Sequence, residues 1–536
     1  MGGVKMVKKR RDSTAVSTNS TILSFTWLSI LTFINFFILI DCCSAGNGCV
    51  FLVPGSTQKI CQLTGNFDAD KNFYQYTVNR TLDQFGIKGT DLGSSFEHNG
   101  RIYFLFGDTI TNQYYQYDLD CIAYTTDTSP DNCVELAFNK SGTRFKPPYV
   151  YPPIPQGGLC VPTEGLSYRR NMYVYFITRD VQGNYFARTV LAKSTNDGYT
   201  FTQLYEMSSH NNAQSPQPKK FINVSAEIVN AADIPGLPQQ TGQLVLIWGS
   251  GEYQASNPYL AYIPLEYIEN KSYLRYFMGT DESNTPRWSE YESDAVPLFD
   301  HPQIGEFSVT WNPYVKKWLM LYNTSAGIIF RVADYPWGPW SDPSILFNPF
   351  IDNGYCNFIH RGDCLTGLCY YEKTCDTNKD NFQRTQCGNI TYAGCRWGGT
   401  YGPYIISKFT TGVVDQETTI YFTLSTWNPY QVMLMKSTLQ MFGDADRDGI
   451  CDVNDNCPYH YNPNQEDSYP PGGGNGCGDA CECEGDLDAD GDVDGDDVFA
   501  FKKGSFDLDG DGDVDGDDAM IFKKDYRRLD CPTNCN

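Results

Sequence analysis

The chain has 536 residues, enough for about three or four domains, and its 41% hydrophobic content excludes a wholly disordered chain. A net charge of −24 argues against a nucleic-acid partner, and only five scattered histidines argue against a histidine-rich zinc centre. The charge is concentrated at one end, because the segment 443–536 contains 26 acidic and seven basic residues. This C-terminal tail therefore needs an explanation separate from that of the rest of the chain.

The N-terminal segment has the pattern of an export signal. Basic residues at 8–11 precede an apolar stretch over 22–40, and the small residues Ser44 and Ala45 follow it. We expect residues 1–45 to be a cleaved signal peptide. The alternative is an uncleaved anchor that ties the chain to a membrane, because this apolar stretch is long for a signal. In both cases the rest of the protein is expected to be secreted or to lie at the extracellular cell surface.

Cysteine usage agrees with export. Cleavage after Ala45 would leave 18 of the 20 cysteines, an even number that predicts disulfides and essentially no free thiol. Eleven of these precede Gly443 and seven follow it, so at least one disulfide should join the two parts. Six Asn-x-Ser/Thr sequons would permit glycosylation in a eukaryotic host, at Asn79, Asn139, Asn223, Asn270, Asn323 and Asn389.

The region 46–442 contains recurring strand pairs. In the first, Asn99-Gly100 separates two apolar runs, which is a strong hairpin signal. The second strands of five such units begin at regular steps, and the one longer step contains a Cys-rich insert at 355–396. This repetition predicts an all-β fold, a five-bladed β-propeller, with a large β-sandwich as the alternative. The five second strands begin at Ile102, Met172, Leu244, Trp318 and Ile420.

The first hairpin places two aspartates in register. If Asn99-Gly100 is a two-residue loop, Asp91 should lie directly opposite Asp108, with Cβ atoms about 5 Å apart. Two such carboxyl groups cannot both ionise freely, and one protonated and one ionised carboxyl group are what the cleavage of a glycosidic bond requires. The alternatives are two solvated loop aspartates or a structural cation site.

Two glutamates and three tryptophans extend this candidate site. Glu164 and Glu306 lie near the start of the first strand of their units, as Asp91 does, so the propeller axis should bring the three together. The alternative for each glutamate is a solvated strand end. Three tryptophans near strand ends are candidates for stacking sugar rings, with core or rim packing as the alternative: Trp248, Trp311 and Trp427.

Several motifs resemble the domain of unknown function 4185 family over about residues 65–440. They are Gly89-Thr-Asp-Leu-Gly93, Phe106-Gly-Asp-Thr109, Gly305-Glu-Phe-Ser-Val309, Pro336-Trp-Gly-Pro-Trp-Ser341 and Ser425-Thr-Trp-Asn-Pro-Tyr430. The resemblance implies a five-bladed propeller and, from the family's characterised members, endo-D-arabinofuranosidase activity on arabinan. It also implies that Asp91 and Asp108 are the catalytic carboxylates. The insert 355–396 departs from the family pattern.

The first part of the tail, residues 443–484, resembles a thrombospondin type 3 repeat. Aspartates alternate with other residues and a glycine permits the turn, a pattern that wraps Ca²⁺ in oxygen ligands. Cys451 and Cys457 are candidates to staple this coil. The expected ligands are Asp444, Asp446, Asp448, Asp452 and Asp455.

The second part, residues 485–536, contains two acidic loops offset by 21 residues, each followed by a helix-like segment. The loops match EF-hand positions with Asp in place of Glu at position 12, which resembles a dockerin. A cohesin-like or cell-surface partner is a separate hypothesis. The expected Ca²⁺ ligands are Asp486, Asp488, Asp490, Asp492 and Asp497 in one loop and Asp507, Asp509, Asp511, Asp513 and Asp518 in the other.

The sequence therefore favours a secreted glycoside hydrolase that acts on a furanoside-containing, arabinan-like polysaccharide and carries a calcium-stabilised tail. The alternative is a non-catalytic glycan-binding or adhesion protein of the cell surface, which the thrombospondin-like repeat also suits. Five-bladed propellers support many chemistries, so the fold by itself does not decide between them.

Overall fold

The computed structural model describes residues 48–68, 70, 75–111, 119–180, 182–209, 219–354, 357–359, 399–427, 429–446, 448–467, 476–487, 490–504, 506, 508, 513–528 and 531. The expected signal segment 1–45 and nearly all of the insert 355–396 lie outside these residues. Among the described residues, no helix is both long and apolar enough to cross a membrane.

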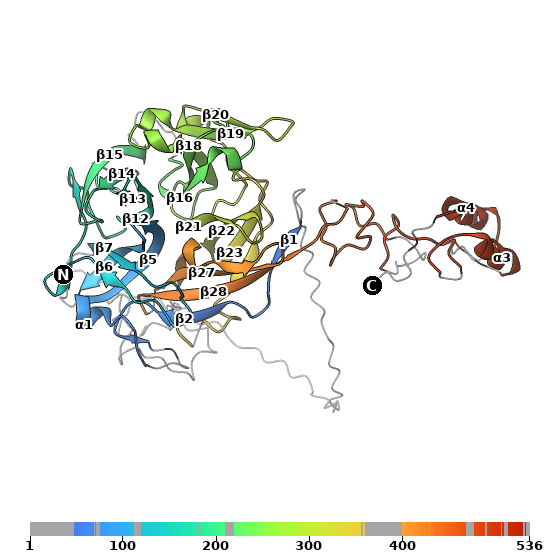
Figure 1. Ribbon diagram of the computed structural model, residues 1–536, viewed down its shortest axis with the longest axis horizontal. Helices are drawn as coiled ribbons and strands as arrows, with labels where there is room; N and C mark the ends of the chain where they lie inside the picture. Colours follow the sequence, from blue (N-terminus) through green and yellow to red (C-terminus); the bar gives the residue numbers. More distant parts are fainter. Residues whose placement is uncertain are drawn as a thin grey trace, which may run out of the picture. The chain divides into compact units, whose positions relative to one another are not determined.

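Five antiparallel sheets of four or more strands form the body of the chain (Figure 1). Blade 1 contains β5 (Ile87–His98), β6 (Arg101–Thr111), β7 (Leu119–Thr125) and β8 (Ala137–Phe138). Blade 2 contains β12 (Pro162–Tyr168), β13 (Asn171–Thr178), β14 (Arg188–Ser194) and β15 (Thr200–Ser209), and β11 (Tyr149–Tyr151) pairs parallel to its edge. Blade 3 contains β16 (Asn223–Asn230), β17 (Gln243–Ser250), β18 (Pro258–Pro264), β19 (Arg275–Thr280) and β20 (Pro286–Ser289).

Blade 4 contains β21 (Phe307–Asn312), β22 (Lys317–Thr324), β23 (Gly327–Ala333) and β24 (Ser344–Phe347). Blade 5 contains β25 (Thr400–Ile405), β26 (Thr411–Val413), β27 (Glu417–Thr426) and β28 (Gln431–Phe442), together with β1 (Cys49–Leu52) and β2 (Gln58–Gln62). Small elements complete the body: β3 (Phe67–Asp68), β4 (Gln75–Tyr76), β9 (Lys140–Ser141), β10 (Arg144–Phe145) and helix α1 (Thr81–Phe85).

The first strands of the five blades close a ring, in the order β5, β12, β16, β21, β25 and back to β5. Hydrogen bonds between neighbouring first strands show that all five run in the same direction around the axis. Between β5 and β12, Ser94 bonds to Glu164 and, further along both strands, His98 bonds to Ser167. The bonds between β16 and β21 and between β21 and β25 advance along both strands in the same way. The ring therefore has a start face, where the first strands begin, and an end face, where they finish. The predicted five-bladed β-propeller is confirmed, and the β-sandwich alternative is excluded.

The second strand of each blade lies where the sequence predicts it. Ile102, Met172, Leu244, Trp318 and Ile420 fall on β6, β13, β17, β22 and β27. The predicted Asn-Gly hairpin is also present, because Asn99 and Gly100 take φ values of 49° and 76°. Positive φ at both positions is the two-residue turn that matches strand twist.

Blade 5 is built from the N-terminal and the C-terminal strands of the propeller. The N-terminal strands β1 and β2 both pair with β28, the last strand of the propeller. A disulfide between Cys49 of β1 and Cys451 of the tail reinforces this closure, and the two cysteines are 402 residues apart in sequence. The predicted disulfide between the two parts of the chain is confirmed.

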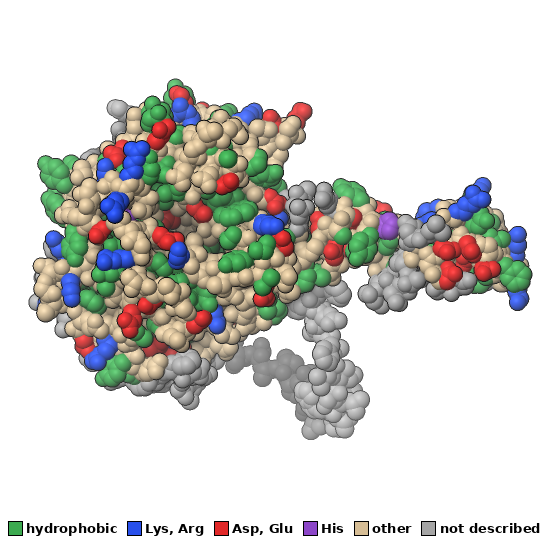
Figure 2. All heavy atoms as spheres, in the orientation of Figure 1, with side chains coloured by type: hydrophobic (Ala, Val, Ile, Leu, Met, Phe, Trp, Pro, Cys, Tyr) green, Lys and Arg blue, Asp and Glu red, His purple; other side chains and the backbone are tan. Residues whose placement is uncertain are grey.

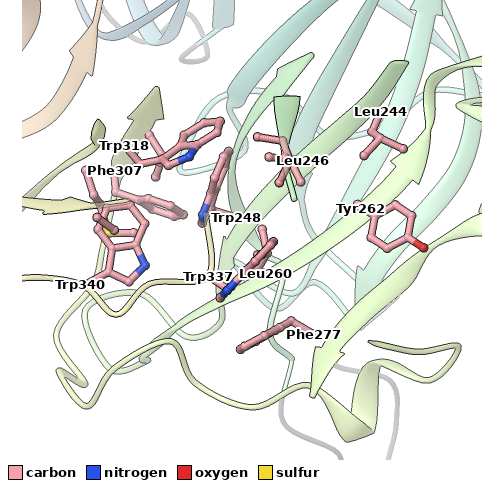
Figure 3. Packing of buried hydrophobic residues seen from close by; sticks show 14 of the residues in the cluster. Leu244, Leu246, Trp248, Leu260, Tyr262, Phe277, Phe307, Trp318, Trp337 and Trp340 are labelled. Atoms are coloured by element: carbon pink, nitrogen blue, oxygen red, sulfur yellow. The ribbon is translucent and has the colours of Figure 1, made fainter. Parts of the chain in front are cut away.

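The core between blades 3 and 4 is rich in tryptophan (Figure 3). Trp248 and Trp318 are fully buried, with ring centroids 5.1 Å apart. The Trp248 Nε1 donates to the backbone oxygen of Pro336 at 3.0 Å, so its polar group is satisfied inside the protein. The prediction that Trp248 stacks a sugar ring is therefore wrong, because Trp248 belongs to the core.

Between cysteines that are both in the described residues, further disulfides are Cys61–Cys133, Cys457–Cys481 and Cys483–Cys531. Cys451 and Cys457 therefore do not pair with each other. Cys121 and Cys160 are free and buried, which corrects the expectation that no thiol would be free. Burial raises the pKa of both thiols, so neither is poised to oxidise. An even cysteine count could not reveal two cysteines that pack as small hydrophobic residues.

Peptide mapping without reduction should recover the Cys49–Cys451 linkage, because both residues are buried and their disulfide joins strand β1 to the tail. Cys121 and Cys160 should react with an alkylating reagent only after denaturation. Fast alkylation of either residue in the native protein would contradict their burial.

Four sequon asparagines, Asn79, Asn139, Asn223 and Asn323, are buried, with 3–4% of each residue exposed. Asn79 donates from Nδ2 to the backbone oxygens of Leu63 and Val134, so this nitrogen is engaged inside the fold. Asn270 is exposed, and Asn389 lies outside the described residues. In the folded protein, the four buried asparagines are therefore less suited to carry a glycan than the sequence pattern predicts.

In the tail, a helix follows each acidic loop, as the sequence predicts. They are α3 (Gly495–Lys503) and α4 (Gly516–Asp525). Acidic side chains cluster on the part of the tail that carries these helices (Figure 2).

Candidate active site

Asp91 and Asp108 lie in the first hairpin, but not directly opposite each other. Asp91 pairs with Gly107, and three register shifts interrupt the ladder between β5 and β6. The predicted register holds from His98 to Ser94 and fails beyond it. The prediction assumed a regular ladder, and β-bulges each insert an extra residue and re-aim the side chains that follow.

Asp108 sits at such an irregularity on both sides, since its pairing with β7 is also shifted between Phe106 and Thr109. Its φ of 41° lies in the left-handed region, which Asp tolerates better than most residues. Both carboxylate oxygens of this buried side chain accept the N–H of Leu159, at 3.0 and 3.2 Å. The preceding Gly107 allows blade 2 to approach, because a Cβ there would lie 2.5 Å from Val161.

Asp91 is held by two tyrosines of blade 5. Its Oδ2 accepts the hydroxyl of Tyr401 at 2.9 Å and that of Tyr430 at 2.6 Å. The Tyr430 hydroxyl also lies 3.4 Å from the backbone oxygen of Asp108, so it connects the two aspartates. Burial, and then the charge of Asp91, raise the pKa of both tyrosines well above the usual value. Both therefore stay protonated and act as hydrogen-bond donors to Asp91.

Glu306 brings a third carboxyl group to this cluster from blade 4, one residue before β21. It is buried, and its Oε2 accepts the hydroxyl of Tyr253 at 3.0 Å. Burial raises the pKa of Glu306 to about 7, and the negative charge of Asp108 acts in the same direction. Burial raises the pKa of Tyr253, and the charges of Glu306 and Asp91 raise it further. With the effect of Asp108 on Glu306, this places the three carboxyl groups in one electrostatic neighbourhood at the start face.

Asp120 of β7 is a carboxyl group that the sequence did not single out. It is fully buried behind the aspartate pair. Burial raises the pKa of Asp120 well above its usual value, and the charges of Asp108 and Asp91 raise it further. Both effects favour the neutral form of Asp120, which reduces the negative charge beside the pair.

Glu164 does not join this cluster at the start face. It lies within β12, and its two carboxylate oxygens link three first strands: Ser94 of β5 donates to one, and Ser225 and Ala226 of β16 donate to the other. Burial raises the pKa of Glu164 to about 7. Glu164 still lies near the cluster, because the pKa of Tyr404 is raised by burial and then by the charges of Glu306, Glu164 and Asp91. The prediction that Glu164 aims at the same mouth is corrected only in that its carboxylate is engaged in cross-linking the first strands.

The two remaining tryptophans lie at opposite faces. Trp427, directly after β27, is 38% exposed, and its ring meets Tyr430 edge-on at 5.6 Å. Trp427 is therefore close to Tyr430, which bonds to Asp91, and its ring is available for stacking beside the carboxyl cluster. Trp311 lies near the end of β21, at the other face, and does not belong to this site.

In the tail, Asp444, Asp446 and Asp448 place carboxylate oxygens within 4.8 Å of one another. Burial raises the pKa of the nearby Asp455, and the charges of Asp448 and Asp444 raise it further. Among the described residues, no hydrogen-bond donor reaches Asp444 Oδ1, Asp446 Oδ2 or Asp455 Oδ2, although all three atoms are buried. Buried oxygens without donors fit a bound hard cation. Asp452 instead accepts the N–H of Ala445, so it supports the loop.

In the paired loops, the last acidic position caps a helix. Asp497 and Asp494 form a capping box at the start of α3, and Asp518 and Asp515 do so at α4. Asp492, Asp494 and Asp497 also bring carboxylate oxygens within 4.8 Å of one another. Asp486 accepts the N–H groups of residues 490 and 491. The other expected ligands in these loops include Asp488, Asp507, Asp509 and Asp511, which lie outside the described residues.

A comparison with protein families identifies the propeller region. The model for the domain of unknown function (DUF4185) matches residues 76–436. The chain belongs to this family. Its propeller supplies both aspartates of the cluster and the two tyrosines that bind Asp91. Tyr430 ends one of the family motifs quoted above, and that motif was the only signal in the sequence for its role; Tyr253, Tyr401 and Asp120 had none.

A curated relative of this DUF4185 member is the notoamide biosynthesis cluster protein J of Aspergillus sp. (strain MF297-2), 24% identical over 343 residues that cover 58% of this chain and 86% of that protein. Among solved structures, the GH43_1 enzyme from Xanthomonas citri has a TM-score of 0.34 at 13% identity, covering 68% of this chain and 90% of that one. Zg3597, a family 117 glycoside hydrolase from Zobellia galactanivorans, has a TM-score of 0.33 at 9% identity, covering 72% and 90%.

Proposed function

We propose that this protein is a secreted glycoside hydrolase that cleaves a furanoside-containing, arabinan-like polysaccharide at the start face of its propeller. The observation that carries the proposal is the convergence of Asp91, Asp108 and Glu306, three buried carboxyl groups in different environments. Two tyrosine hydroxyls donate to Asp91, which suits an ionised carboxylate, whereas the pKa of Glu306 is about 7. Carboxyl groups with separated protonation states are the requirement for acid/base cleavage of a glycosidic bond.

In the proposed mechanism, Asp91 and Asp108 are the acid/base pair and Glu306 is a supporting carboxyl group. The register shift at Asp108 and the bond from Leu159 fix the direction of its carboxylate, while Tyr401 and Tyr430 fix that of Asp91. Such preorganisation lowers the cost of orienting the catalytic groups during reaction. Trp427 provides an exposed aromatic surface for a sugar ring next to this pair.

The substrate class rests on the resemblance to family members that cut arabinan. The test is incubation of the full-length protein with a panel of arabinans, other furanosides and pyranose polymers such as xylan, with released oligosaccharides as the readout. Release from a furanoside supports the proposal. Binding of a polymer without any release would favour the non-catalytic glycan-binding or adhesion function.

We also propose that the tail binds Ca²⁺ through Asp444, Asp446, Asp448 and Asp455, and through the loops that precede α3 and α4. Ca²⁺ would neutralise acidic groups that otherwise repel one another. Docking to a cohesin-like or cell-surface partner is a further hypothesis about the same tail. The disulfides of the described chain support export to an oxidising compartment.

Addition of a chelator should unfold the tail over about residues 443–530 and leave the thermal transition of the propeller in place. Asp446→Asn should weaken the effect of added Ca²⁺ on the tail, with Glu466→Gln, at an exposed residue of the same segment, as a comparison outside the carboxylate clusters. Circular dichroism with and without chelator checks the result. A tail whose spectrum ignores the chelator would refute Ca²⁺ binding.

A further inference from the structure

A cavity of about 450 Å³ opens between blades 3 and 4, outside the carboxyl cluster. Its walls come from the end of β16, from Trp311 and Trp318 of blade 4, and from the segment 334–336 that follows β23. A volume within about 300–1,000 Å³ is typical of sites for small molecules. This cavity holds none of the groups used in the proposed mechanism.

The cavity lies toward the end face of the propeller. The backbone N–H of Trp311 donates to Glu227 Oε2 at 3.0 Å, so Trp311 and Glu227 are at one level of the ring. Glu164 lies beside Ser225 and Ala226, and Ser94 lies beside Glu164, which puts Asp91 about five residues nearer the start face than Glu227. At about 3.3 Å per residue this is a separation of roughly 16 Å along the axis. The two sites are therefore distinct.

The cavity has a rigid aromatic wall. Trp311 is 36% exposed, and the buried ring of Trp318 meets it at 61°, so packing fixes one edge of Trp311 while part of its surface stays open. Tyr335 stacks on Trp337 with ring centroids 5.4 Å apart. The bond from Trp248 to Pro336 holds this segment against the core shown in Figure 3. These rings are therefore positioned before any ligand arrives.

The polar groups of the cavity are acidic or amide side chains. Asp334 pairs with the buried Lys317 at 2.6 Å, and Asn230 donates to Asp233 at 2.9 Å. Gln243 is exposed at the rim. Carboxylates and amides can bond to hydroxyl groups, whereas an acidic wall disfavours anions.

We propose that this cavity is a second carbohydrate-binding site, which holds a neutral sugar ring against Trp311 and bonds its hydroxyl groups through the surrounding carboxylates and amides. The C–H face of a sugar ring is apolar and packs on an aromatic ring, while its hydroxyl groups need polar partners. A second site on the opposite face would hold a polymer independently of cleavage. The proposal goes beyond hydrolysis, because binding here requires no turnover.

The test is electrophoresis of the full-length protein through native gels that contain soluble arabinan, arabinogalactan or xylan, with polygalacturonate as the anionic probe. Trp311→Ala should weaken retardation by a neutral polymer at least about threefold. Trp311→Leu, which keeps apolar packing on Trp318, should do the same. Tyr291→Ala is the matched control, since Tyr291 is a 68% exposed aromatic residue of blade 3 outside the cavity. The rate on a short soluble oligosaccharide should be equal in all four proteins.

The outcomes separate this site from the proposed active site. Absence of hydrolysis with retardation that depends on Trp311 would remove the proposed function and keep the second site. The second site is overturned if no neutral polymer retards the parent, if both Trp311 variants migrate as the parent does, or if only polygalacturonate binds. Loss of retardation in Trp427→Ala alone would also overturn it, because the binding would then belong to the start face.

Discussion

Asp108→Asn should lower the turnover of a cleaved furanoside by at least about 10²-fold, the lower limit of what acid/base assistance contributes. Asparagine preserves the shape of the side chain, and its oxygen can still accept the N–H of Leu159. Asp91→Asn should have an effect of similar size, because its amide oxygen can keep the bonds from Tyr401 and Tyr430. In each variant the lost property is the carboxyl group itself.

Stability separates this prediction from a structural effect. The negative charge of Asp108 raises the pKa of Asp120 and Glu306, which shows that the carboxyl groups of the cluster repel one another. Removing one negative charge should therefore keep or raise the temperature of the thermal transition. Glycan binding should persist. If the parent cleaves a furanoside and Asp108→Asn cleaves it equally fast, the assignment of the pair is wrong. Glu306 with Asp91 would then be the next pair to test, since Glu164 is occupied in linking strands.

The propeller should lose stability as the pH rises from about 4.5 to above 7. Burial raises the pKa of Glu164, Glu227 and Glu306 to about 7 in the folded protein, whereas an unfolded glutamate titrates near its model value of 4.5. Between these values the folded state holds protons that the unfolded state has released. Each glutamate therefore stabilises the fold fully below about pH 4.5, and this stabilisation is lost as the pH rises through 7, with a slope of at most about 1.4 kcal/mol per pH unit.

Glu306→Gln should flatten this pH profile, because glutamine cannot ionise and its oxygen can still accept the bond from Tyr253. It should also impair turnover, which is a separate readout. Glu417→Gln is the matched control, since Glu417 is an exposed residue of β27. Urea unfolding at several pH values between 4.5 and 8.5 measures the slopes. Parallel profiles for the parent and Glu306→Gln would contradict a buried, protonated Glu306.

The fold was predictable because blade repetition leaves a periodic signal. Each second strand is an apolar run, and the Asn99-Gly100 turn fixes the start of its hairpin through backbone angles that these residues accept. Register at a distance from the turn was not predictable, because a bulge depends on packing against a neighbouring blade. At Gly107 the neighbour is Val161, more than 50 residues away in sequence.

The site was predictable only in part, for a related reason. Asp91, Asp108 and Glu306 stand in recognisable motifs, and the propeller axis brings them together. The tyrosines that bind Asp91 come from blade 5 and reach it only after the ring closes, so no local sequence pattern predicts their role. For Trp248, the sequence predicted a role in the site that the structure does not support. A tryptophan near a strand end has the same local sequence whether it packs inside or faces solvent.

The shared construction of blade 5 has a consequence for how the protein is made. Strands β1 and β2 leave the ribosome early, but their partner β28 begins only at Gln431. At synthesis rates of about 5–20 residues per second, these strands wait roughly 20–75 s with unpaired edges. Exposed edges of this kind invite pairing with other chains, so the nascent propeller depends on protection by chaperones until its last strand arrives. A chain cut short before β28 would keep four blades and an incomplete fifth, in which β1 and β2 lack their partner strand, and it would be a substrate for quality control rather than a smaller propeller.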